Sequence, residues 1–460
     1  MNSVDNTDYI KSKNIRILSY NVFLRPPGIS SYFRSEGDLK DERTREITNI
    51  IKDYDIVMFQ ELFNISLFGF NFISNRLKIM IEIGKKMGFK YYVSPIETPY
   101  FNISLVNSGL LILSKYPIFE SDSLNYDHGY GFDMMSKKGV LYAKIMIIIE
   151  NSAIPLHIFN THAQSGDLYE ETVVRWKQLQ QLINFIYKKI PENETAIIGG
   201  DFNLDSINNA LFSKTDKTVL LKGTDESKEY KIFCDMLSGS KKGIKREIID
   251  CLAKLHKSRD TQLEDALLFD SASKKSDGKE HFMYNLPFFS RQRKQYNKQL
   301  QYIKKHPVTI FGHTEIGVYS DSETEPSDIL RSLDYIFLLP PLNKNVKIEL
   351  IEAKPKPYLN IPKAIKFINN MLPRFLTLSD HYAIETEIKI SIVSEENKTS
   401  DIIDYKEPFE TNNNSNIIFD MITIILLIIK AVIVFLTLLI WHIPYKIYLF
   451  MLFVLIYYYF

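Results

Sequence analysis

Short apolar segments alternate with longer helical segments from residue 14 to about residue 205, and this alternation limits the folds open to the chain. The apolar segments are rich in Ile, Val, Leu and aromatic residues and are bounded by turn formers, which is typical of buried strands. The predicted strands are Ile15–Ser19, Ile56–Phe59, Leu110–Leu113, Val140–Ile149, Leu156–Asn160, Ala196–Ile198, Leu333–Leu339 and His381–Ile390. The pattern indicates a layered α/β domain, whose strand order the spacing does not fix.

The clearest helix is predicted after Ser165. Apolar residues recur there at spacings of three and four, which is the period of one helix face. They are Val173, Trp176, Leu179, Ile183 and Ile186. Glu170 and Glu171 come early and Lys188 and Lys189 come late in this segment, which suits the helix dipole.

Composition divides the chain into further parts. Residues 206–330 carry clusters of charge and are predicted to be a large insertion into a domain that spans residues 14–390. Residues 391–416 are polar and poor in core-forming residues, which predicts a linker. Residues 417–460 are strongly apolar, and one or two transmembrane helices are predicted there.

The two apolar runs of this last part differ in length. Met421–Trp441 is long enough to cross a bilayer, whereas Ile447–Phe460 is short for a full span. The N-terminal segment lacks the apolar run of a signal peptide, and the two cysteines, Cys234 and Cys251, are typical of free thiols in a reducing compartment. We therefore expect an integral membrane protein whose N-terminal domain lies in the cytosol.

Polar residues that can bind a metal ion or move a proton stand next to several predicted strands. Asn21, Gln60, Glu61, Thr161, His162, Asp201 and Asn203 follow apolar runs, and Asp380 and His381 precede one. If the strands lie side by side, these ends converge on one edge of the sheets, where α/β enzymes keep their sites. Each residue alone also has a structural explanation, such as a surface charge for Glu61 or a turn former for Asp201.

Seven motifs occur in order along the chain: SYNVF at 19–23, FQELF at 59–63, GLLILSKYPI at 109–118, FNTHAQ at 159–164, GGDFN at 199–203, SLDYIF at 332–337 and LSDHYAI at 378–384. In these motifs the chain resembles the endonuclease/exonuclease/phosphatase superfamily, and within it the neutral sphingomyelinases. The resemblance implies a four-layer α/β/β/α sandwich of two mixed β-sheets flanked by helices. It also implies hydrolysis of a phosphodiester by water, without a covalent intermediate.

The resemblance implies metal-binding and proton-transfer roles for individual residues. Glu61, with Asn21 nearby, would hold Mg²⁺ through oxygen ligands and waters. His381 would be the general base or a phosphate-contacting imidazole, oriented by Asp334. Asp380 would lie beside the metal ion or its water.

Three more residues are expected to act on the attacking water and on the developing charge. Asp201 and Asn203 project to the same face of an extended segment, so both can address one reacting group. The resemblance implies that they orient the attacking water. It implies that His162 donates a hydrogen bond to the charge that develops on phosphorus.

A lipid substrate is favoured by the predicted membrane anchor, by the motif match, and by a formal charge of +1, which gives no general attraction to nucleic acid. Residues 133–142 resemble the Asp-x4-Lys-Gly segment of eukaryotic neutral sphingomyelinases. This implies that Lys138 approaches the lipid phosphate and that Asp133 positions it. We therefore expect a Mg²⁺-dependent sphingomyelinase that works at a lipid bilayer and releases phosphocholine from sphingomyelin or a related choline phospholipid.

Other functions remain open at this point. The same chemistry suits an inositol phosphosphingolipid phospholipase C and, with weaker motif support, a phosphoinositide phosphatase or a nuclease. A membrane-tethered binding domain without activity would be expected to lack a metal or base residue, and Glu61, Asp201, Asn203 and His381 are all present. No nucleic acid partner is expected, and the oligomeric state is left open.

Overall fold

The computed structural model describes residues 11–25, 40–63, 76–95, 107–206, 208–209, 222–223, 227–239, 245–255, 310–311, 330–342, 345–356, 378–379 and 381–393. All of them belong to the first of the two units into which the chain divides, Met1–Asp404 and Tyr405–Phe460. The predicted linker begins too early, because residues 391 and 392 belong to strand β16 (Ala383–Ile392). The rest of the linker from residue 394 and both apolar runs lie outside the described residues, so these predictions stand as made. Within the described part of the chain, no helix combines the length and the apolar character that a membrane span requires.

The first of two large sheets has the strand order β15-β16-β1-β2-β4-β3. Its strands are β1 (Lys11–Leu24), β2 (Ile56–Leu62), β3 (Tyr91–Val93), β4 (Leu111–Ser114), β15 (Val346–Lys356) and β16 (Ala383–Ile392). β1 and β2 are parallel, and the other neighbouring pairs are antiparallel. The sheet is therefore mixed, with its parallel pair flanked by antiparallel strands.

The second sheet repeats this arrangement with the strand order β11-β14-β8-β7-β6-β5. Its strands are β5 (Ile118–Asn125), β6 (Gly139–Ile149), β7 (Ser152–His162), β8 (Thr195–Asp201), β11 (Ile249–Asp250) and β14 (Asp334–Leu339). Here β7 and β8 are the parallel pair. Two short hairpins, β9 (Asn208–Asn209) with β10 (Lys222–Gly223) and β12 (Ile310–Phe311) with β13 (Leu330–Arg331), complete the described strands.

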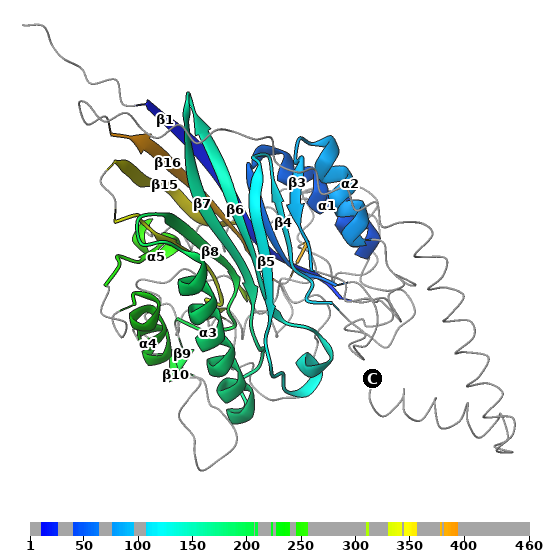
Figure 1. Ribbon diagram of the computed structural model, residues 1–460. Coiled ribbons are helices and arrows are strands. Elements are labelled where there is room, and N and C mark those ends of the chain that lie inside the picture. The colour runs from blue at the N-terminus through cyan, green and yellow to red at the C-terminus, as the bar shows by residue number, and fades with distance from the viewer. Residues whose placement is uncertain are drawn as a thin grey trace, which may run out of the picture. The chain divides into compact units, whose positions relative to one another are not determined.

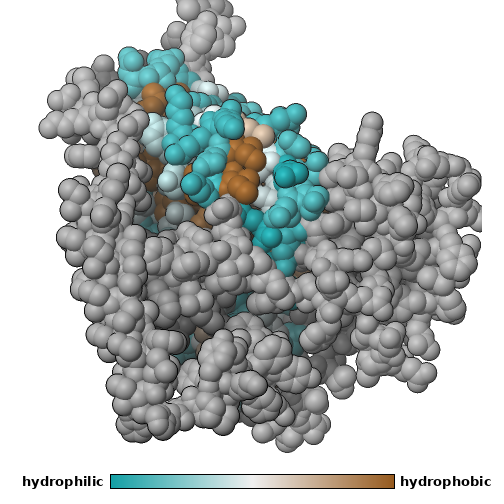
Figure 2. Space-filling model, turned by 90° about the vertical axis from the view of Figure 1, so that its right-hand side faces the viewer, coloured by the Kyte–Doolittle hydropathy of each residue, from teal (hydrophilic) through white to brown (hydrophobic). Residues whose placement is uncertain are grey.

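Helices cover the outer faces of both sheets (Figure 1). They are α1 (Lys40–Ile50), which runs into the 3₁₀ turn η1 (Ile51–Asp53), α2 (Arg76–Lys86), α3 (Tyr169–Lys189) and α4 (Lys228–Leu237). The short helix α5 (Cys251–Leu255) instead packs its Cys251 and Leu252 into the cluster between the sheets, and η2 (Gly131–Met135) lies in a loop. The face that carries α1 and α2 is mostly hydrophilic where described residues reach the surface, with small apolar areas between the polar ones (Figure 2). This pattern is expected of amphipathic helices that pack against a sheet.

Three apolar clusters hold these layers together. The central cluster lies between the sheets and includes Ile17 and Met58 from the first sheet and Ile158 and Ile197 from the second. A second cluster packs α3 and α4 against the second sheet, and a third packs α1 and α2 against the first. Because side chains alternate along a strand, each strand supplies one face to the central cluster and the other to a helix layer. The structure confirms the predicted α/β fold with two mixed sheets.

The predicted strands are present, but several extend beyond the apolar runs that predicted them. Asn21, Glu61, His162 and Asp201 were expected to follow strands, and the structure places them inside the last residues of β1, β2, β7 and β8. That expectation was wrong in this detail, because backbone pairing does not depend on the side chain being apolar. His381 likewise was expected to begin a strand, and it precedes β16.

A layer of buried amides separates the central apolar cluster from the polar strand ends. Gln60 and Asn160 are both fully buried, one on each sheet. Gln60 Nε2 donates to Asn160 Oδ1 at 2.7 Å, and Asn160 Nδ2 donates to the carbonyl oxygens of Phe59 at 2.8 Å and Leu111 at 3.1 Å. These hydrogen bonds join β7 to β2 and β4, so they set the separation of the sheets beside the polar ends.

Replacing Asn160 by leucine is expected to lower the free energy of unfolding by about 2–4 kcal/mol, because two buried backbone carbonyls would lose the Asn160 donor and Gln60 Nε2 would keep only its longer contacts with Ser19 and Met58, both at 3.3 Å. Urea unfolding followed by circular dichroism measures this change. Asn14→Leu removes an asparagine whose hydrogen bond to Glu387 is exposed, and we expect it to change stability by less than about 0.5 kcal/mol. Equal losses in the two variants would contradict a stabilising role for the amide layer.

Candidate active site

The polar residues at the strand ends come together because they share the face that points between the sheets. Residues an even number of positions apart along a strand point to the same face of the sheet. Asn21, His162 and Asp201 are each four positions after an isoleucine of the central cluster, namely Ile17, Ile158 and Ile197. Because β1, β2, β7 and β8 form two parallel pairs, their carboxyl ends lie at one edge. β14 runs antiparallel to β8, so Asp334, its first residue, pairs with Asp201 at the same edge.

Glu61 reaches this edge through an unusual backbone conformation. Met58 and Gln60 point between the sheets, so regular alternation would turn Glu61 toward the helix layer. Its φ of 55° instead lies in the left-handed region, which non-glycine residues adopt rarely. Gly109 permits this turn, because a Cβ at that position would meet the Glu61 Cα at 3.1 Å. Strain held at a polar residue is typical of functional sites.

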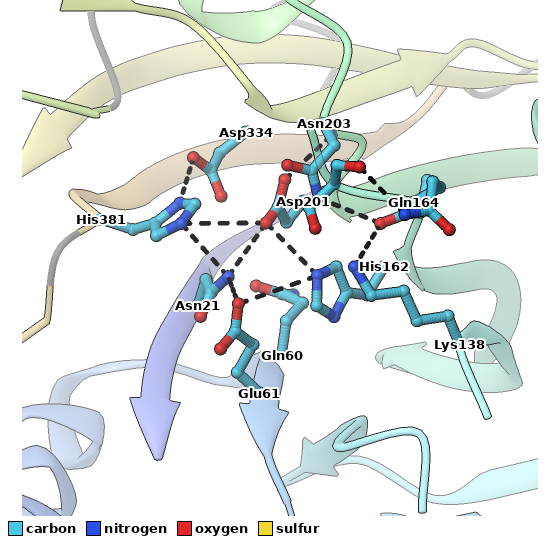
Figure 3. A network of polar contacts seen from close by, with 12 residues as sticks. Asn21, Gln60, Glu61, Lys138, His162, Gln164, Asp201, Asn203, Asp334 and His381 are labelled. Carbon is cyan, nitrogen blue, oxygen red and sulfur yellow. Dashed lines mark hydrogen bonds and ion pairs between the residues drawn. The ribbon is translucent and has the colours of Figure 1, made fainter. Parts of the chain in front are cut away.

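His381 and Asp334 form a carboxylate–histidine pair (Figure 3). Asp334 Oδ2 lies 2.8 Å from His381 Nδ1, and both side chains are nearly fully buried. His381 Nε2 lies 3.3 Å from Asn21 Nδ2 and 3.8 Å from Asp201 Oδ2. The proton is therefore assigned to Nδ1, where the carboxylate accepts it, and Nε2 is the acceptor nitrogen that faces the cluster.

Asn21 joins the two carboxylates at the centre of the cluster. Its Nδ2 donates to Glu61 Oε1 at 3.0 Å and to Asp201 Oδ2 at 2.9 Å. Its Oδ1 accepts a hydrogen bond from the backbone N–H of Phe23. Asn21 thus lies where it was predicted to lie, beside Glu61, but it contacts the carboxylates through its nitrogen.

Asp201 is the most deeply buried carboxylate of the cluster. Burial and the nearby Asp334 raise the pKa of Asp201 to about 6, against the opposing effects of His381 and Lys138. The preceding Gly200 has a φ of 137°, and a Cβ there would lie 2.0 Å from the Thr161 carbonyl oxygen. Gly200 of the GGDFN motif therefore lets β8 approach β7 closely enough to bring Asp201 beside His162.

Asn203 and His162 complete the predicted set. Asn203, with a φ of 50°, donates from its backbone N–H to Asp201 Oδ1 at 2.9 Å and from Nδ2 to the carbonyl of Ala163 at 3.0 Å. His162 Nε2 lies 3.6 Å from Asp201 Oδ2 and 3.8 Å from Glu61 Oε1, which is too long for hydrogen bonds. Burial, with Lys138 and His381 nearby, lowers the pKa of His162 well below its usual value, so the imidazole is neutral at pH 7.

The cluster can hold a divalent metal ion. One ligand atom from each of Glu61, Asp201 and His381 lies within 4.8 Å of the others. Two carboxylates that converge in a buried place repel each other, and a cation between them removes that repulsion. Their oxygens are the donors that a hard cation such as Mg²⁺ prefers. Glu61 was the predicted ligand and Asp201 joins it in this group, whereas Asn21 turns its amide nitrogen and not its oxygen to the carboxylates, so its predicted part in metal binding stays a prediction.

Lys138 and Asp133 form a buried ion pair at the rim of the cluster. Lys138 Nζ lies 2.7 Å from Asp133 Oδ2 and donates to the carbonyl oxygen of Ala163 at 2.7 Å. Asp133 also accepts hydrogen bonds from the backbone N–H and the hydroxyl of Ser165, both at 2.8 Å. Ala163 also accepts a hydrogen bond from Asn203, so this ion pair adjoins the cluster. The predicted contact of Lys138 with a lipid phosphate stays a prediction. In the structure the Lys138 ammonium forms an ion pair with Asp133 and a hydrogen bond with the Ala163 carbonyl oxygen.

Stability is expected to depend on this ion pair at acid pH. Burial opposes ionisation of Asp133, but the Lys138 charge and the Ser165 hydrogen bonds outweigh it and lower the pKa of Asp133. A lowered pKa stabilises the fold above the unfolded-state value of about 3.9, and that stability is lost as the pH falls toward the folded-state pKa. Asp133→Asn should therefore be about 3 kcal/mol less stable than the wild type at pH 7, with a smaller gap below about pH 4.

Unfolding in urea at a series of pH values between 3 and 7 measures this gap. Glu82→Gln serves as the control, because Glu82 and Lys78 form an exposed pair with 3.9 Å between charged atoms. This control should cost less than about 1 kcal/mol at every pH. A gap for Asp133→Asn that stays constant with pH would contradict the ion-pair account.

Most of the predicted site residues lie together, and some contributors were not predicted. Asp380 lies outside the described residues, so its placement beside the metal ion stays a prediction. Asn160, Arg43 and Ser379 support the cluster through buried hydrogen bonds and were not named from the sequence, whereas Gln60 was named among the polar residues beside the strands but was given no role. Gln60 and Asn160 stand inside the FQELF and FNTHAQ motifs, and an amide within an apolar strand is the signal that could have marked them.

Comparison with known proteins establishes the family of this chain. The model of the endonuclease/exonuclease/phosphatase family matches residues 18–338, well over half of the chain, so the chain belongs to this family. A sphingomyelinase of Dictyostelium discoideum is 34% identical over 194 residues, which cover 36% of this chain and 40% of that protein. Sphingomyelinase C 2 of Leptospira interrogans is 32% identical over 223 residues, which cover 44% of this chain and 33% of that protein. This chain thus matches less than half the length of either relative.

A similar solved structure is that of sphingomyelinase C from Streptomyces griseocarneus. The two chains are 17% identical and have a TM-score of 0.47, over 82% of this chain and 99% of that one.

Proposed function

We propose that this chain is a metal-dependent phosphodiesterase of the sphingomyelinase type, which hydrolyses a membrane phospholipid in the manner of a phospholipase C. The observation that carries the proposal is the orientation of His381. Its Nδ1 is tied to Asp334 at 2.8 Å, which leaves Nε2 as the acceptor nitrogen beside Asp201, Asn21 and Glu61. A general base needs an acceptor nitrogen that faces the place where the reacting water is held.

The residues of the cluster divide the work of hydrolysis. Glu61 and Asp201 would hold Mg²⁺, which when bound neutralises phosphate charge and polarises a phosphoryl oxygen. Asp201 and Asn203 orient the attacking water, and His381 Nε2 takes its proton while Asp334 stabilises the imidazolium that forms. The neutral His162 has one N–H, which donates to the charge that develops on phosphorus. The bond from phosphorus to the lipid oxygen then breaks, and the leaving alkoxide takes a proton from solvent.

Two features support a lipid substrate. Lys138 and Asn203 both donate to the Ala163 carbonyl oxygen, so the Lys138 ammonium lies at the rim of the cluster. This ammonium can contact a substrate phosphate when it releases Asp133. The sequence relatives are sphingomyelinases, and the proposal takes sphingomyelin or a related choline phospholipid as the substrate. Ceramide, or diglyceride from a glycerophospholipid, and phosphocholine would be the products.

A panel of lipids tests the substrate. The full chain, solubilised in detergent, is incubated with Mg²⁺ and mixed micelles of sphingomyelin, lysophosphatidylcholine, inositol phosphosphingolipid or a phosphoinositide, and separately with DNA, and the water-soluble phosphate esters are identified by mass spectrometry. We expect phosphocholine from sphingomyelin at the highest rate. Release of inositol phosphate alone would move the assignment to an inositol phosphosphingolipid phospholipase C, and cleavage of phosphoinositides or DNA alone would overturn the lipid phosphodiesterase proposal.

We propose that residues 417–460 anchor the protein in a membrane and leave the catalytic domain on the cytosolic side. The apolar run of 421–441 supports the anchor, and the two free thiols, Cys234 and Cys251, support a domain in the reducing cytosol. Protease added outside sealed, right-side-out plasma-membrane vesicles should leave residues 1–390 intact. Ready digestion of this domain in intact vesicles would contradict the orientation.

A further inference from the structure

The β-sheet does not by itself fix the distance between Asn21 and His381. The antiparallel pairing of β1 with β16 ends at Ser19 and Ile384, and both site residues lie beyond that last pair. Asn21 Nδ2 is nevertheless 3.3 Å from His381 Nε2. Contacts outside the sheet must therefore hold the two residues together.

Ser379 provides one such contact. Its hydroxyl donates to the Asn21 carbonyl oxygen at 2.6 Å and accepts a hydrogen bond from the His381 backbone N–H at 3.2 Å. The serine is fully buried. It therefore joins the backbone of Asn21 to the backbone of His381 through a single oxygen atom.

Arg43, on α1, provides the second contact and is 1% exposed. Its Nη2 donates to the carbonyl oxygens of Val22 at 2.6 Å and Phe23 at 3.0 Å, and its Nε donates to the carbonyl oxygen of Leu378 at 2.8 Å. Val22 and Phe23 directly follow Asn21, and Leu378 directly precedes Ser379. One guanidinium thus spans the two segments that carry Asn21 and His381.

The end of β1 is irregular at the point where Arg43 binds it. The pairing with β2 shifts by one residue between Asn21 and Leu24, and Phe23 has a φ of 49° in the left-handed region. A bulge of this kind turns carbonyl groups out of the ladder, and buried carbonyls need donors. Arg43 supplies donors to two of them, and so stabilises the bend that aims Asn21 at the carboxylates.

We propose that Arg43 is a positioning residue for the phosphodiesterase reaction, which acts by holding Asn21 and His381 in register at the end of β1. The inference rests on the proposed function. The planar fork of arginine presents several donors in a fixed arrangement, whereas a lysine ammonium is a single flexible centre. Arg43→Lys therefore keeps the positive charge but loses the bridge between the two segments.

The first test compares Arg43→Lys with a matched control, Arg246→Lys, in the detergent-solubilised full chain. Arg246 is 2% exposed and also donates to backbone carbonyls, those of Glu194 at 2.7 Å and Pro340 at 2.9 Å, at the opposite end of β8 and β14. Arg43→Lys should lower kcat for sphingomyelin by roughly 10- to 100-fold with KM within about threefold, since displacement of a catalytic group by 1 Å has effects of this size. Arg246→Lys should lower thermal stability and leave kcat unchanged.

A double-mutant cycle separates positioning from a general structural effect. In the His381→Ala background, Arg43→Lys should lower kcat by less than about twofold, because the imidazole whose place relative to Asn21 depends on Arg43 is gone. The full 10- to 100-fold loss in that background, or an unchanged kcat in the single variant, overturns the proposal. If Arg43→Lys does not fold, Ser379→Ala breaks the same bridge, and the same kcat loss and the same non-additivity are expected of it.

A readout without turnover keeps this inference distinct from the proposed function. If the wild type hydrolyses no phosphodiester, the proposed function fails, and nitrogen-15 NMR of the histidine rings then tests the positioning alone. The His381 signals are assigned by their loss in His381→Ala. Arg43→Lys should shift them and Arg246→Lys should not, and unshifted signals in Arg43→Lys overturn the inference.

Discussion

His381→Ala is expected to lower kcat for lipid phosphodiester hydrolysis by about a thousandfold, the middle of the range for loss of a general base. The imidazole is the acceptor nitrogen of the cluster, and its Nδ1 is oriented by Asp334 at 2.8 Å. His162 is a poor replacement, because burial lowers its pKa and so makes it a weaker base, and its Nε2 lies near two carboxylate oxygens at 3.6 and 3.8 Å. The loss should appear in kcat, with little change in KM.

His157→Gln is the control for this variant. His157 is also buried, on the same strand β7, but its ring contacts Glu194 and Tyr142 on the face turned toward the helix layer. We expect its replacement to reduce stability and to leave kcat within about threefold of the wild type, because substitutions remote from the reacting groups act through folding. A comparable kcat loss in both variants would mean that His381 acts through the fold and not on the reaction.

Glu61→Gln is expected to have the second large effect, through metal affinity. The substitution keeps the shape of the side chain and removes one of the two carboxylates that converge with His381. The Mg²⁺ concentration for half-maximal activity should rise by roughly 100-fold or more, since even residues behind the ligands change metal affinity by 10- to 100-fold. Isothermal titration calorimetry with Mg²⁺ measures the same loss without turnover.

Glu194→Gln is the matched control for the metal experiment. The Glu194 side chain is 21% exposed, close to the 14% of Glu61, and it pairs with Lys144 and His157 away from the cluster. The Glu194→Gln variant should bind Mg²⁺ at the site as tightly as the wild type does. An unchanged Mg²⁺ affinity in Glu61→Gln would remove Glu61 from the metal site.

The central strands were predictable because both their faces are buried. β2 and β8, for example, carry continuous apolar runs that no other element explains as well. β5 and β15 were missed, since they lie at the edges of their sheets and alternate charged with apolar residues, as in the sequence of Val346–Lys356. Charges on edge strands are common, and they hide the strand from a search for apolar runs.

The site was predictable as a set of residue types at strand ends, but its geometry was not. The alternation of side chains along a strand explains why Asn21, His162 and Asp201 meet, and this alternation can be read from the sequence once the strands are known. The left-handed backbone conformation at Glu61 interrupts the regular alternation of side chains along β2, and no pattern of residue types predicts it. Arg43 and Ser379 act through backbone carbonyls of segments far away in the chain, which a single sequence does not reveal.

The most direct test of this account is phosphocholine release from sphingomyelin by the wild-type chain in mixed micelles, measured with Mg²⁺, after addition of EDTA, and after Mg²⁺ is restored. The account predicts release that EDTA abolishes and that excess Mg²⁺ recovers. Release that continues in EDTA would contradict a metal ion held by Glu61 and Asp201. No release from any lipid, by a protein that binds Mg²⁺, would contradict the sphingomyelinase-type activity itself.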